Sequence, residues 1–345
     1  THLLLRGRAG SPGPVVQPGI PTVLAPTQPK FLGSDQFTSR RRLSLARWIV
    51  DPQNPLTARV IVNRVWQYHF GQGLVNTPSD FGVLGTEPEH PELLEWLANW
   101  FVHDAKWSLK KLHRLILSSN TYRMSKRNHP EYGTEDPENA YFWRFPYRRL
   151  AVETIRDSML AASGSLNRKM QGESTYLSVP KEALDGHSDP GKIWKPFDER
   201  EASRRTVYAF IKRSMIVPML EVLDLCDTTR STAKRNITIV PTQALTLYNG
   251  EFVNRQSRHL AARLLREAGD DSSQQIDRAY RLTLCRPPTS SEMKTLQQFL
   301  QHEQKQLLLE SKQKNQSMTQ NEAKRRALTR LCRVIFNLNE FVYPD

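Results

Sequence analysis

Apolar residues recur at helical spacing over most of the chain, most clearly in the segment 57–70. At about 100° per residue its apolar side chains fall on one arc of a helix, whereas Arg59, Asn63 and Gln67 form a row on the other. The arc consists of Ala58, Ile61, Val62, Val65, Trp66 and Tyr68. Gly71 then allows the helix to end in a left-handed turn. We expect the polar row either to bind a carboxylate, a sulfate or a sugar hydroxyl, or to join neighbouring helices through an internal network.

The same periodicity predicts further helices, separated by segments rich in Pro, Gly and polar residues. They are expected at about 39–50, 91–104, 108–123, 150–163, 276–284, 291–309 and 321–337, with one or two further helices over 241–268. β-Branched and aromatic runs at 206–211 and 236–240 predict two short strands. The expected fold class is mainly α, a multi-helix orthogonal bundle with a few short strands and long irregular loops.

Pro and Gly also divide the chain into parts. They are frequent over residues 1–38, which predicts an extended N-terminal arm or linker, and residues 39–345 form the expected helical domain. Gly, Pro and charge mix again over 165–203, so we expect a long loop that divides the domain into two halves and acts as a lid or rim. Because the chain begins at Thr1 rather than Met, we expect it to be the C-terminal portion of a longer protein. No apolar run approaches the roughly 18 to 20 residues needed to span a bilayer.

Two carboxylates and two guanidinium groups share one face of the helix expected after residue 148. They belong to Arg149, Glu153, Arg156 and Asp157. If burial raised the pKa of one carboxyl while an arginine kept the other ionised, Glu153 and Asp157 could divide acid and base roles, as in glycoside hydrolysis. Arg149 and Glu153 are also an ordinary i, i+4 pair, so the alternative interpretation is a salt-bridge network packed against another element.

A second polar group surrounds the expected junction between the strand at 236–240 and the helix that follows it. Arg235, Asn236, Thr242 and Gln243 lie there, beside the free backbone N–H groups of a helix start. Such a junction binds anions, although the same residues also serve to cap a helix. The chain has no glycine-rich phosphate loop, so nucleotide binding is not favoured.

Acidic residues and a histidine gather between the helices expected at 57–70 and 91–104. Asp80, Glu87 and His90 are the residues that could ligate a divalent metal if the turn at 82–85 folds back. Acidic residues at a helix N-terminus also stabilise the helix dipole without any metal, and His90 could simply cap the helix. His69 falls inside the apolar arc of the first helix, which predicts a buried, hydrogen-bonded histidine.

Seven ordered blocks of the sequence carry a resemblance to a known family. They are RRRLSLARWIVDPQNPLTARVIVNRVWQYHFGQGLV, TPSDFGVLGTEPEHPELLEWLA, WSLKKLHRLILSSNTYR, RRLAVETIRDSMLAASG, RRTVYAFIKR, RNITIVPTQALTLYN and FNLNEFVYPD. On these blocks the chain resembles the planctomycete cytochrome-c-associated PSD-type family, domain of unknown function 1553. The resemblance implies no activity. It implies an exported, periplasmic or cell-surface protein in which cytochrome-c-like and associated domains lie upstream.

Charge and cysteine content refine these expectations. Lys and Arg number 49 against 35 Asp and Glu, which gives a net charge of +14 and favours a polyanionic partner. The basic residues are dispersed and no RRM, KH or zinc-finger motif is present, so nucleic acid is disfavoured. For an exported protein, an acidic or sulfated glycan fits better. Cys226, Cys285 and Cys332 form no CxxC or CxxCH motif, so we expect no cofactor in this chain. The family resemblance implies haem c on an upstream domain.

Two functional hypotheses follow. The first is an accessory or binding domain for a polyanionic glycan or a protein partner. The second is an enzyme, either a carbohydrate-active hydrolase or a haem-coupled redox enzyme, with Glu153 and Asp157 or the cluster from Asp80 to His90 as its site. Convergence of the carboxylates with Asn63 and Gln67 in one cleft would favour the enzyme, whereas carboxylates saturated by arginine would disfavour it.

Overall fold

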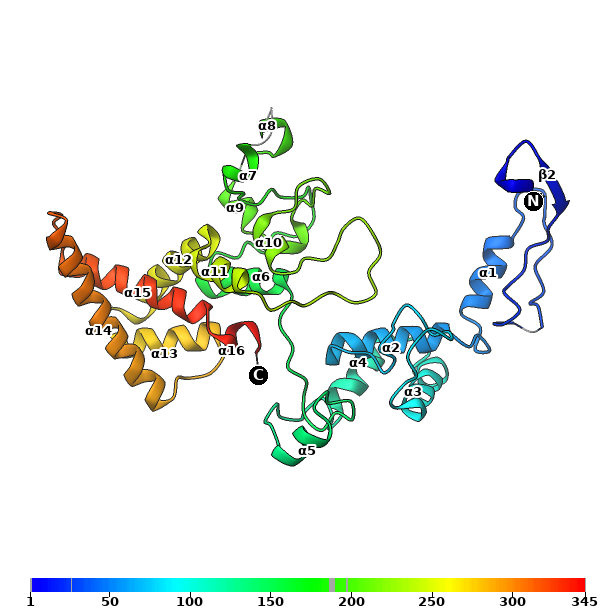
Figure 1. Ribbon diagram of the computed structural model, residues 1–345, viewed down its shortest axis with the longest axis horizontal. Coiled ribbons are helices and arrows are strands. Elements are labelled where there is room, and N and C mark those ends of the chain that lie inside the picture. Colours follow the sequence, from blue (N-terminus) through cyan, green and yellow to red (C-terminus); the bar gives the residue numbers. More distant parts are fainter. Residues whose placement is uncertain (1, 26, 186–189, 197, 345) are drawn as a thin grey trace. The chain divides into compact units, whose positions relative to one another are not determined.

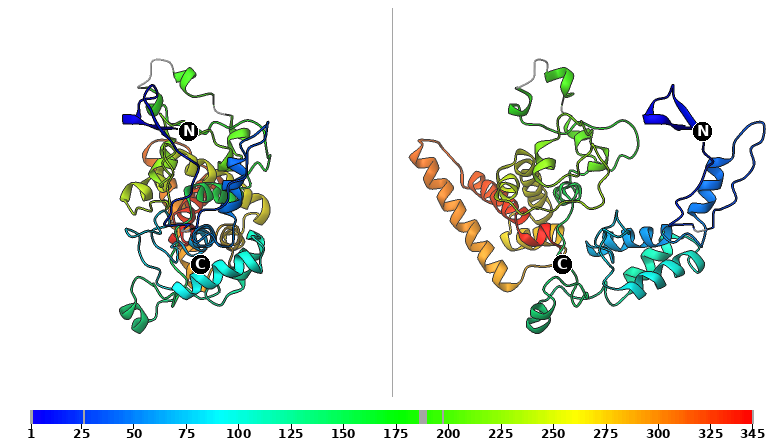
Figure 2. Two further views of the ribbon diagram at one scale, coloured as in Figure 1. Left: turned by 90° about the vertical axis from the view of Figure 1, so that its right-hand side faces the viewer. Right: turned by 45° about the vertical axis from the view of Figure 1, so that its right-hand side comes forward.

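The computed structural model describes residues 2–25, 27–185, 190–196 and 198–344. The chain folds into two compact units, Thr1–Pro146 and Tyr147–Asp345. The segment 165–203, where the sequence led us to expect a division, therefore lies inside the second unit. The ribbon views show both units as assemblies of helices joined by irregular segments (Figures 1 and 2).

The first unit opens with a two-stranded antiparallel sheet. Strand β1 (His2–Leu4) pairs with β2 (Pro12–Val15) in a hairpin near the N-terminus (Figure 1). In this pairing His2 faces Val15 and Leu4 faces Pro12. The N-terminal part of the expected arm thus forms a hairpin, and an irregular chain follows it as far as α1. Among the described residues this hairpin is the one β-sheet. The second unit has only isolated β-bridges in its described part.

The helices of the first unit are α1 (Arg41–Ile49), α2 (Thr57–Phe70), α3 (Pro91–His103), α4 (Leu109–Ser118) and α5 (Pro130–Glu135). Helix α2 packs on α3, and Val62, Trp66 and Phe70 supply its buried face. The apolar arc predicted for α2 is thus largely confirmed, but the placement of Tyr68 on it is wrong, because this side chain is 69% exposed. Tyr68 lies two residues from both Trp66 and Phe70, which turns it to the opposite side of the helix.

The second unit is built around long helices near the C-terminus. Its helices are α6 (Val152–Ser163), α7 (Glu182–Asp185), α8 (Pro190–Ile193), α9 (Glu199–Ala202), α10 (Pro218–Val222), α11 (Pro241–Asn249), α12 (Glu251–Ala268), α13 (Ser272–Thr283), α14 (Ser290–Gln313), α15 (Gln320–Phe336) and α16 (Asn339–Val342). Helix α12 contacts α6, α13 and α15, and α14 lies beside α15 (Figures 1 and 2). Fully buried Leu260 and Leu264 of α12 meet Leu331 and Ile335 of α15 in the main core. The mainly helical fold class is confirmed.

The two strands predicted in this unit are wrong. Residues Thr206–Tyr208 form a short 3-10 helix, and beyond them Ala209 makes only an isolated bridge to Thr175. The segment 236–240 has no regular secondary structure. In both places a side-chain carboxylate accepts from a backbone N–H that would otherwise bond to a neighbouring strand. Asp157 accepts from the N–H of Thr206, and Asp224 accepts from the N–H of Thr238.

One buried arginine holds part of the segment 165–203 in place. The Arg204 side chain is 1% exposed, and its guanidinium donates to the backbone carbonyls of Lys169 at 3.2 Å, Gln171 at 2.5 Å and Glu173 at 3.0 Å. The central carbon of this guanidinium lies 4.1 Å from the centre of the Tyr208 ring. The described part of this segment is therefore fastened to the second unit by these hydrogen bonds and by Leu177, Trp194 and Ala202, which are buried in the main apolar core.

Candidate functional site

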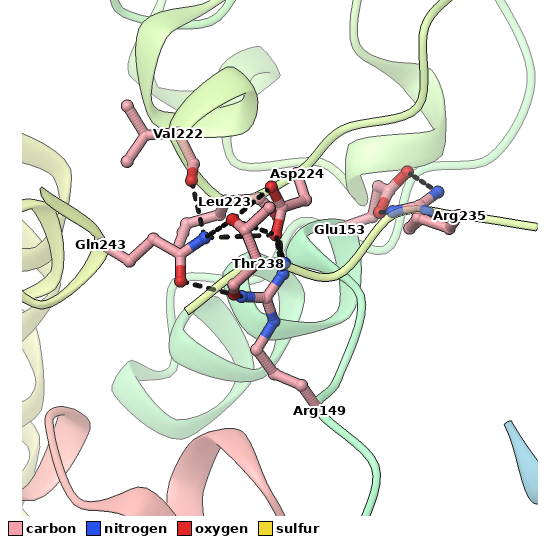
Figure 3. A network of polar contacts seen from close by, with 8 residues as sticks. All are labelled: Arg149, Glu153, Val222, Leu223, Asp224, Arg235, Thr238 and Gln243. Carbon is pink, nitrogen blue, oxygen red and sulfur yellow. Dashed lines mark hydrogen bonds and ion pairs between the residues drawn. The ribbon is translucent and has the colours of Figure 1, made fainter. Parts of the chain in front are cut away.

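Arg149 lies just before α6 and is the centre of a polar network (Figure 3). It is 7% exposed. Its guanidinium donates to Asp224 at 2.6 Å and to the side-chain oxygen of Gln243 at 3.0 Å. It also donates to the carbonyls of Thr238 at 2.9 Å and Leu223 at 3.4 Å. The arginine expected to bind a ligand thus has most of its hydrogen-bonding groups occupied by the protein.

Gln243 completes this network from the first turn of α11. Its amide nitrogen donates to the carbonyl of Val222 at 3.1 Å, to Asp224 at 3.1 Å and to the Thr238 hydroxyl at 2.9 Å. Burial alone would raise the pKa of Asp224, but hydrogen bonds from Thr238 and Arg149 outweigh it and lower this pKa. We call Arg149, Asp224, Thr238 and Gln243 the Arg149 network; it ties the end of α10 to the start of α11.

Glu153, a candidate acid or base, is bound by Arg235 rather than by Arg149. The two guanidinium nitrogens meet the two carboxylate oxygens at 2.7 and 2.9 Å, and each side chain is 30% exposed (Figure 3). Burial acts to raise the pKa of Glu153, yet the hydrogen bond from Arg235 prevails and lowers it. A general acid at neutral pH needs a raised pKa, so this geometry stands against that role for Glu153.

Asp157, the second carboxylate, is held by a different set of partners. One of its oxygens accepts from the backbone N–H of Thr206 at 2.7 Å and from the Thr206 hydroxyl at 2.6 Å. The neighbouring Arg156 is 3% exposed and donates to that hydroxyl at 3.1 Å and to the carbonyls of Arg204 and Ala202. Burial lowers the pKa of Arg156 to about 10. Glu153 and Asp157 therefore have separate partners and do not form a shared proton site.

The remaining residues predicted at the junction before α11 are more accessible. Asn236 is exposed in the irregular segment that precedes the helix, and Thr242 lines a cavity between α10 and α11. With Arg235 and Gln243 both occupied, the four residues predicted there do not converge on one anion site.

The polar row predicted on α2 is divided between two different roles. Arg59 forms an ion pair with Glu95 of α3, with both nitrogen–oxygen distances at 2.5 Å. Asn63 is fully buried, as the internal-network alternative requires and the ligand-binding alternative does not. Gln67 is half-buried. The row therefore presents no continuous ligand surface.

Asn63 has a structural role that explains its burial. Its amide donates to the carbonyl of Val75 at 3.1 Å and accepts from the Val75 N–H at 2.8 Å. A Cβ atom at Gly73 would lie 2.6 Å from the Asn63 side-chain oxygen, so only glycine allows this close approach. The amide thus fastens the turn after α2 to the helix in the way a strand partner would.

The residues considered for a metal site each have another environment. Asp80 accepts from the Gly82 N–H at 2.8 Å, and Glu87 is exposed. His90 hydrogen-bonds the carbonyl of Ala140 at 3.1 Å and does not cap α3 with its side chain. Within the described ranges no group of three His, Cys, Asp or Glu side chains is placed to hold a metal ion.

His69 is half-buried rather than part of the core. Its Nε2 lies 2.8 Å from Nδ1 of His113 on α4, and the Tyr122 ring meets it edge to face at 5.5 Å. The predicted hydrogen bond of His69 is thus confirmed, whereas its predicted full burial is not. The pair of imidazoles links α2 to α4.

The basic residues, which we expected to be dispersed, include one concentrated stretch that the sequence motifs did not reveal. Residues 105–130, here called the basic segment, contain seven Lys and Arg and no Asp or Glu. The seven are Lys106, Lys110, Lys111, Arg114, Arg123, Lys126 and Arg127. All except Lys126 are classed as exposed, and Lys126 lies 6.0 Å above the Phe145 ring. A search for long windows free of acidic residues would have found it.

Helix α4 presents part of the basic segment on one side. Its apolar side chains Leu112 and Ile116 are buried, whereas Lys110, Lys111 and Arg114 point outward. Lys111 donates to a backbone carbonyl, and none of these three forms an ion pair with a described carboxylate. Their charge is therefore available to an external anion.

A sequence model of the PSD1 family, described as a protein of unknown function (DUF1553), matches residues 41–300, three quarters of the chain. The chain belongs to the PSD1 family. The PSD1 match contains every residue considered above, from Arg59 to Gln243, and it ends within α14. No curated protein and no solved structure matches the chain. The described part of this PSD1 chain includes no helix long and apolar enough to cross a membrane.

Proposed function

We propose that this chain is an accessory binding domain that holds an acidic or sulfated glycan through the basic segment. The observation that carries the proposal is the run of seven cations without an acidic residue, six of them exposed. A run without acidic residues along the sequence favours a local positive potential. The ligand-binding role expected from the sequence is thereby moved from the arginines around α6 to the residues around α4.

The side chains of the basic segment suit sulfate and carboxylate groups. Arg114, Arg123 and Arg127 can each bind an oxyanion with two parallel hydrogen bonds, whereas lysines act as point charges. Lys110 and Arg114 are separated by one helical turn, so their Cβ atoms lie roughly 6 Å apart on one side of α4. A linear polyanion with repeated charged groups can contact several of these side chains at once.

The cellular setting of the proposal rests on the sequence resemblance. We place the chain in an exported, periplasmic or cell-surface protein with cytochrome-c-like haem and associated domains upstream. The chain itself has no CxxCH motif, so haem c would belong to those domains. A glycan-binding domain in such a protein would keep the haem domain close to an acidic polysaccharide.

A binding titration of the whole chain tests the proposal. We expect heparin, a sulfated glycan, to bind more weakly as salt increases, and a neutral glycan of similar length not to bind. The double variant K110E/K111E should weaken heparin binding by about tenfold, since it reverses two outward-facing charges on α4. The matched control is K305E/K312E, which makes the same charge change at exposed positions of α14.

Two results would contradict the proposal. Equal loss of affinity in K110E/K111E and K305E/K312E would mean that net charge alone attracts heparin. Binding that does not respond to salt, or that is equal for the neutral glycan, would remove the electrostatic basis altogether. If no glycan binds and the full-length protein instead binds another protein through the basic segment, the physiological ligand is a protein partner.

A further inference from the structure

The second unit contains a cavity of about 540 Å³ between α10, α11 and the start of α12. Its volume lies within the range of pockets that bind small molecules. The lining residues are Ser178, Pro180, Val217, Pro218, Met219, Val222, Thr242, Leu245, Thr246, Asn249, Gly250, Glu251 and Phe252. All of them belong to the second unit, so this cavity is separate from the basic segment.

One face of α11 forms a wall of the cavity. Thr242, Leu245, Thr246 and Asn249 are spaced i, i+3, i+4 and i+7, and therefore point the same way. The opposite face carries Gln243 and Leu247, both of which are buried. Helix α11 is thus held from behind and presents an ordered face to the cavity.

The Arg149 network fixes the distance between the two main walls. Gln243 at the start of α11 donates to Val222, which is both the last residue of α10 and a lining residue. Gly250 allows α12 to start directly after α11, because a Cβ there would overlap the carbonyl oxygen of Thr246. The walls are therefore positioned before any ligand arrives, which reduces the entropy lost on binding.

The lining has little charge to offer. Glu251 is the ionisable group among the lining residues, and Arg255 already pairs with it at 3.3 Å. The apolar part of the cavity lining consists of proline, valine, methionine, leucine and phenylalanine side chains. Among them Leu245 is 58% exposed. Water against such a surface finds few hydrogen-bonding partners, so displacing it by an apolar ligand is favourable.

Three polar side chains give the cavity a direction. No described group hydrogen-bonds the side chains of Thr242, Thr246 or Asn249, and all three lie on α11. A hydroxyl or carbonyl group on a ligand could therefore bind along α11 while its apolar part contacts Pro218, Met219 and other lining residues.

We propose that this cavity binds an uncharged, mainly apolar small molecule with a hydroxyl or carbonyl group at one end. The volume, the paired state of Glu251 and the ordered walls carry the assignment. This binding is independent of the glycan proposal, because its residues lie in the other unit.

Two fluorescent probes with a common ring system test the charge requirement. N-phenyl-1-naphthylamine is uncharged, whereas 8-anilinonaphthalene-1-sulfonate carries an added sulfonate. We expect the whole chain to bind one equivalent of the uncharged probe with an affinity at least about tenfold higher than that of the sulfonate. Equal affinities, or unsaturable fluorescence, would overturn the proposal.

Variants locate the binding. L245Q replaces an apolar wall at an exposed position, so we expect the fold to persist and affinity for the uncharged probe to fall about tenfold. T246W should fill the cavity and abolish saturable binding. L309Q is the matched control, because Leu309 is a 52% exposed leucine on α14 outside the cavity. Circular dichroism confirms folding, and unchanged binding in folded L245Q, or equal loss in L309Q, would place the probe elsewhere and refute the assignment.

Discussion

Replacing Arg149 by methionine should loosen the join between α10 and α11. The substitution keeps an unbranched side chain but removes the guanidinium bonds to Asp224, Gln243 and two backbone carbonyls. Asp224, whose side chain is 13% exposed, then loses its only described ion-pair partner. Thr238 and Gln243 still donate to it, so the carboxylate is left partly satisfied.

The expected cost follows from the bonds that are lost. The charged bond to Asp224 contributes about 1.5 to 3 kcal/mol, and the neutral acceptors contribute about 1 kcal/mol each. With three neutral acceptors the lost bonds sum to about 4.5 to 6 kcal/mol. The free energy of unfolding of the second unit should therefore fall by about 5 kcal/mol, the upper end of the range of about 3 to 5 kcal/mol observed when one member of a buried pair is removed. R235M breaks the Glu153 pair, whose side chains are each 30% exposed, and should cost only about 1 kcal/mol.

The measurement must report on the second unit alone. Six of the seven tryptophans lie in the first unit, so intrinsic fluorescence would follow the wrong part of the chain. Hydrogen exchange with mass spectrometry resolves peptides from α10 and α11 directly. We expect R149M to accelerate exchange there far more than R235M does. If the two variants accelerate exchange equally, the Arg149 network does not hold these helices together.

Three further outcomes are expected. The pKa values of Asp224 and Glu153 are lowered in the folded protein, so the two carboxylates contribute their full stabilisation above the unfolded pKa of about 4. This stabilisation is lost as the pH falls through the folded pKa values. Midpoints of urea unfolding measured across the acid range check this expectation. N63A should lower the stability of the first unit by about 2 to 3 kcal/mol, read from tryptophan fluorescence, whereas loss below about 0.5 kcal/mol would contradict the role of its amide. Because burial raises the pKa of the Cys332 thiol, Ellman's reagent should label exposed Cys285 in the folded protein and reach Cys332 only on unfolding.

Helix positions could be predicted because they depend on local spacing. Helix α2 spans the predicted residues 57–70, and Gly71 and Gly164 adopt the left-handed conformation expected after helix ends. Ser108 accepts a hydrogen bond from the N–H of Lys111, as a helix cap does. Each of these signals is contained within a few residues of sequence.

The partners of the polar residues could not be predicted in the same way. Arg149 pairs with Asp224, which lies 75 residues away, and not with Glu153, because α6 begins only at Val152 and Arg149 does not lie on the helix. The role of Asn63 was left open between ligand binding and an internal network, because a helical wheel cannot show that the chain after the helix returns to cover it. Periodicity describes one helix at a time, whereas these contacts depend on tertiary packing.

The carbonyl-bound arginines have a consequence for handling the protein. Arg204 is held by three backbone carbonyls, with Glu201 at 3.6 Å as its counter-ion, and such short-range bonds around a buried guanidinium respond little to dissolved ions. The exposed cations around α4 are screened within about 10 Å at 0.1 M salt. A salt gradient should therefore release an anionic polymer from the chain while the segment held by Arg204 keeps its shape, so that elution and unfolding become separate events.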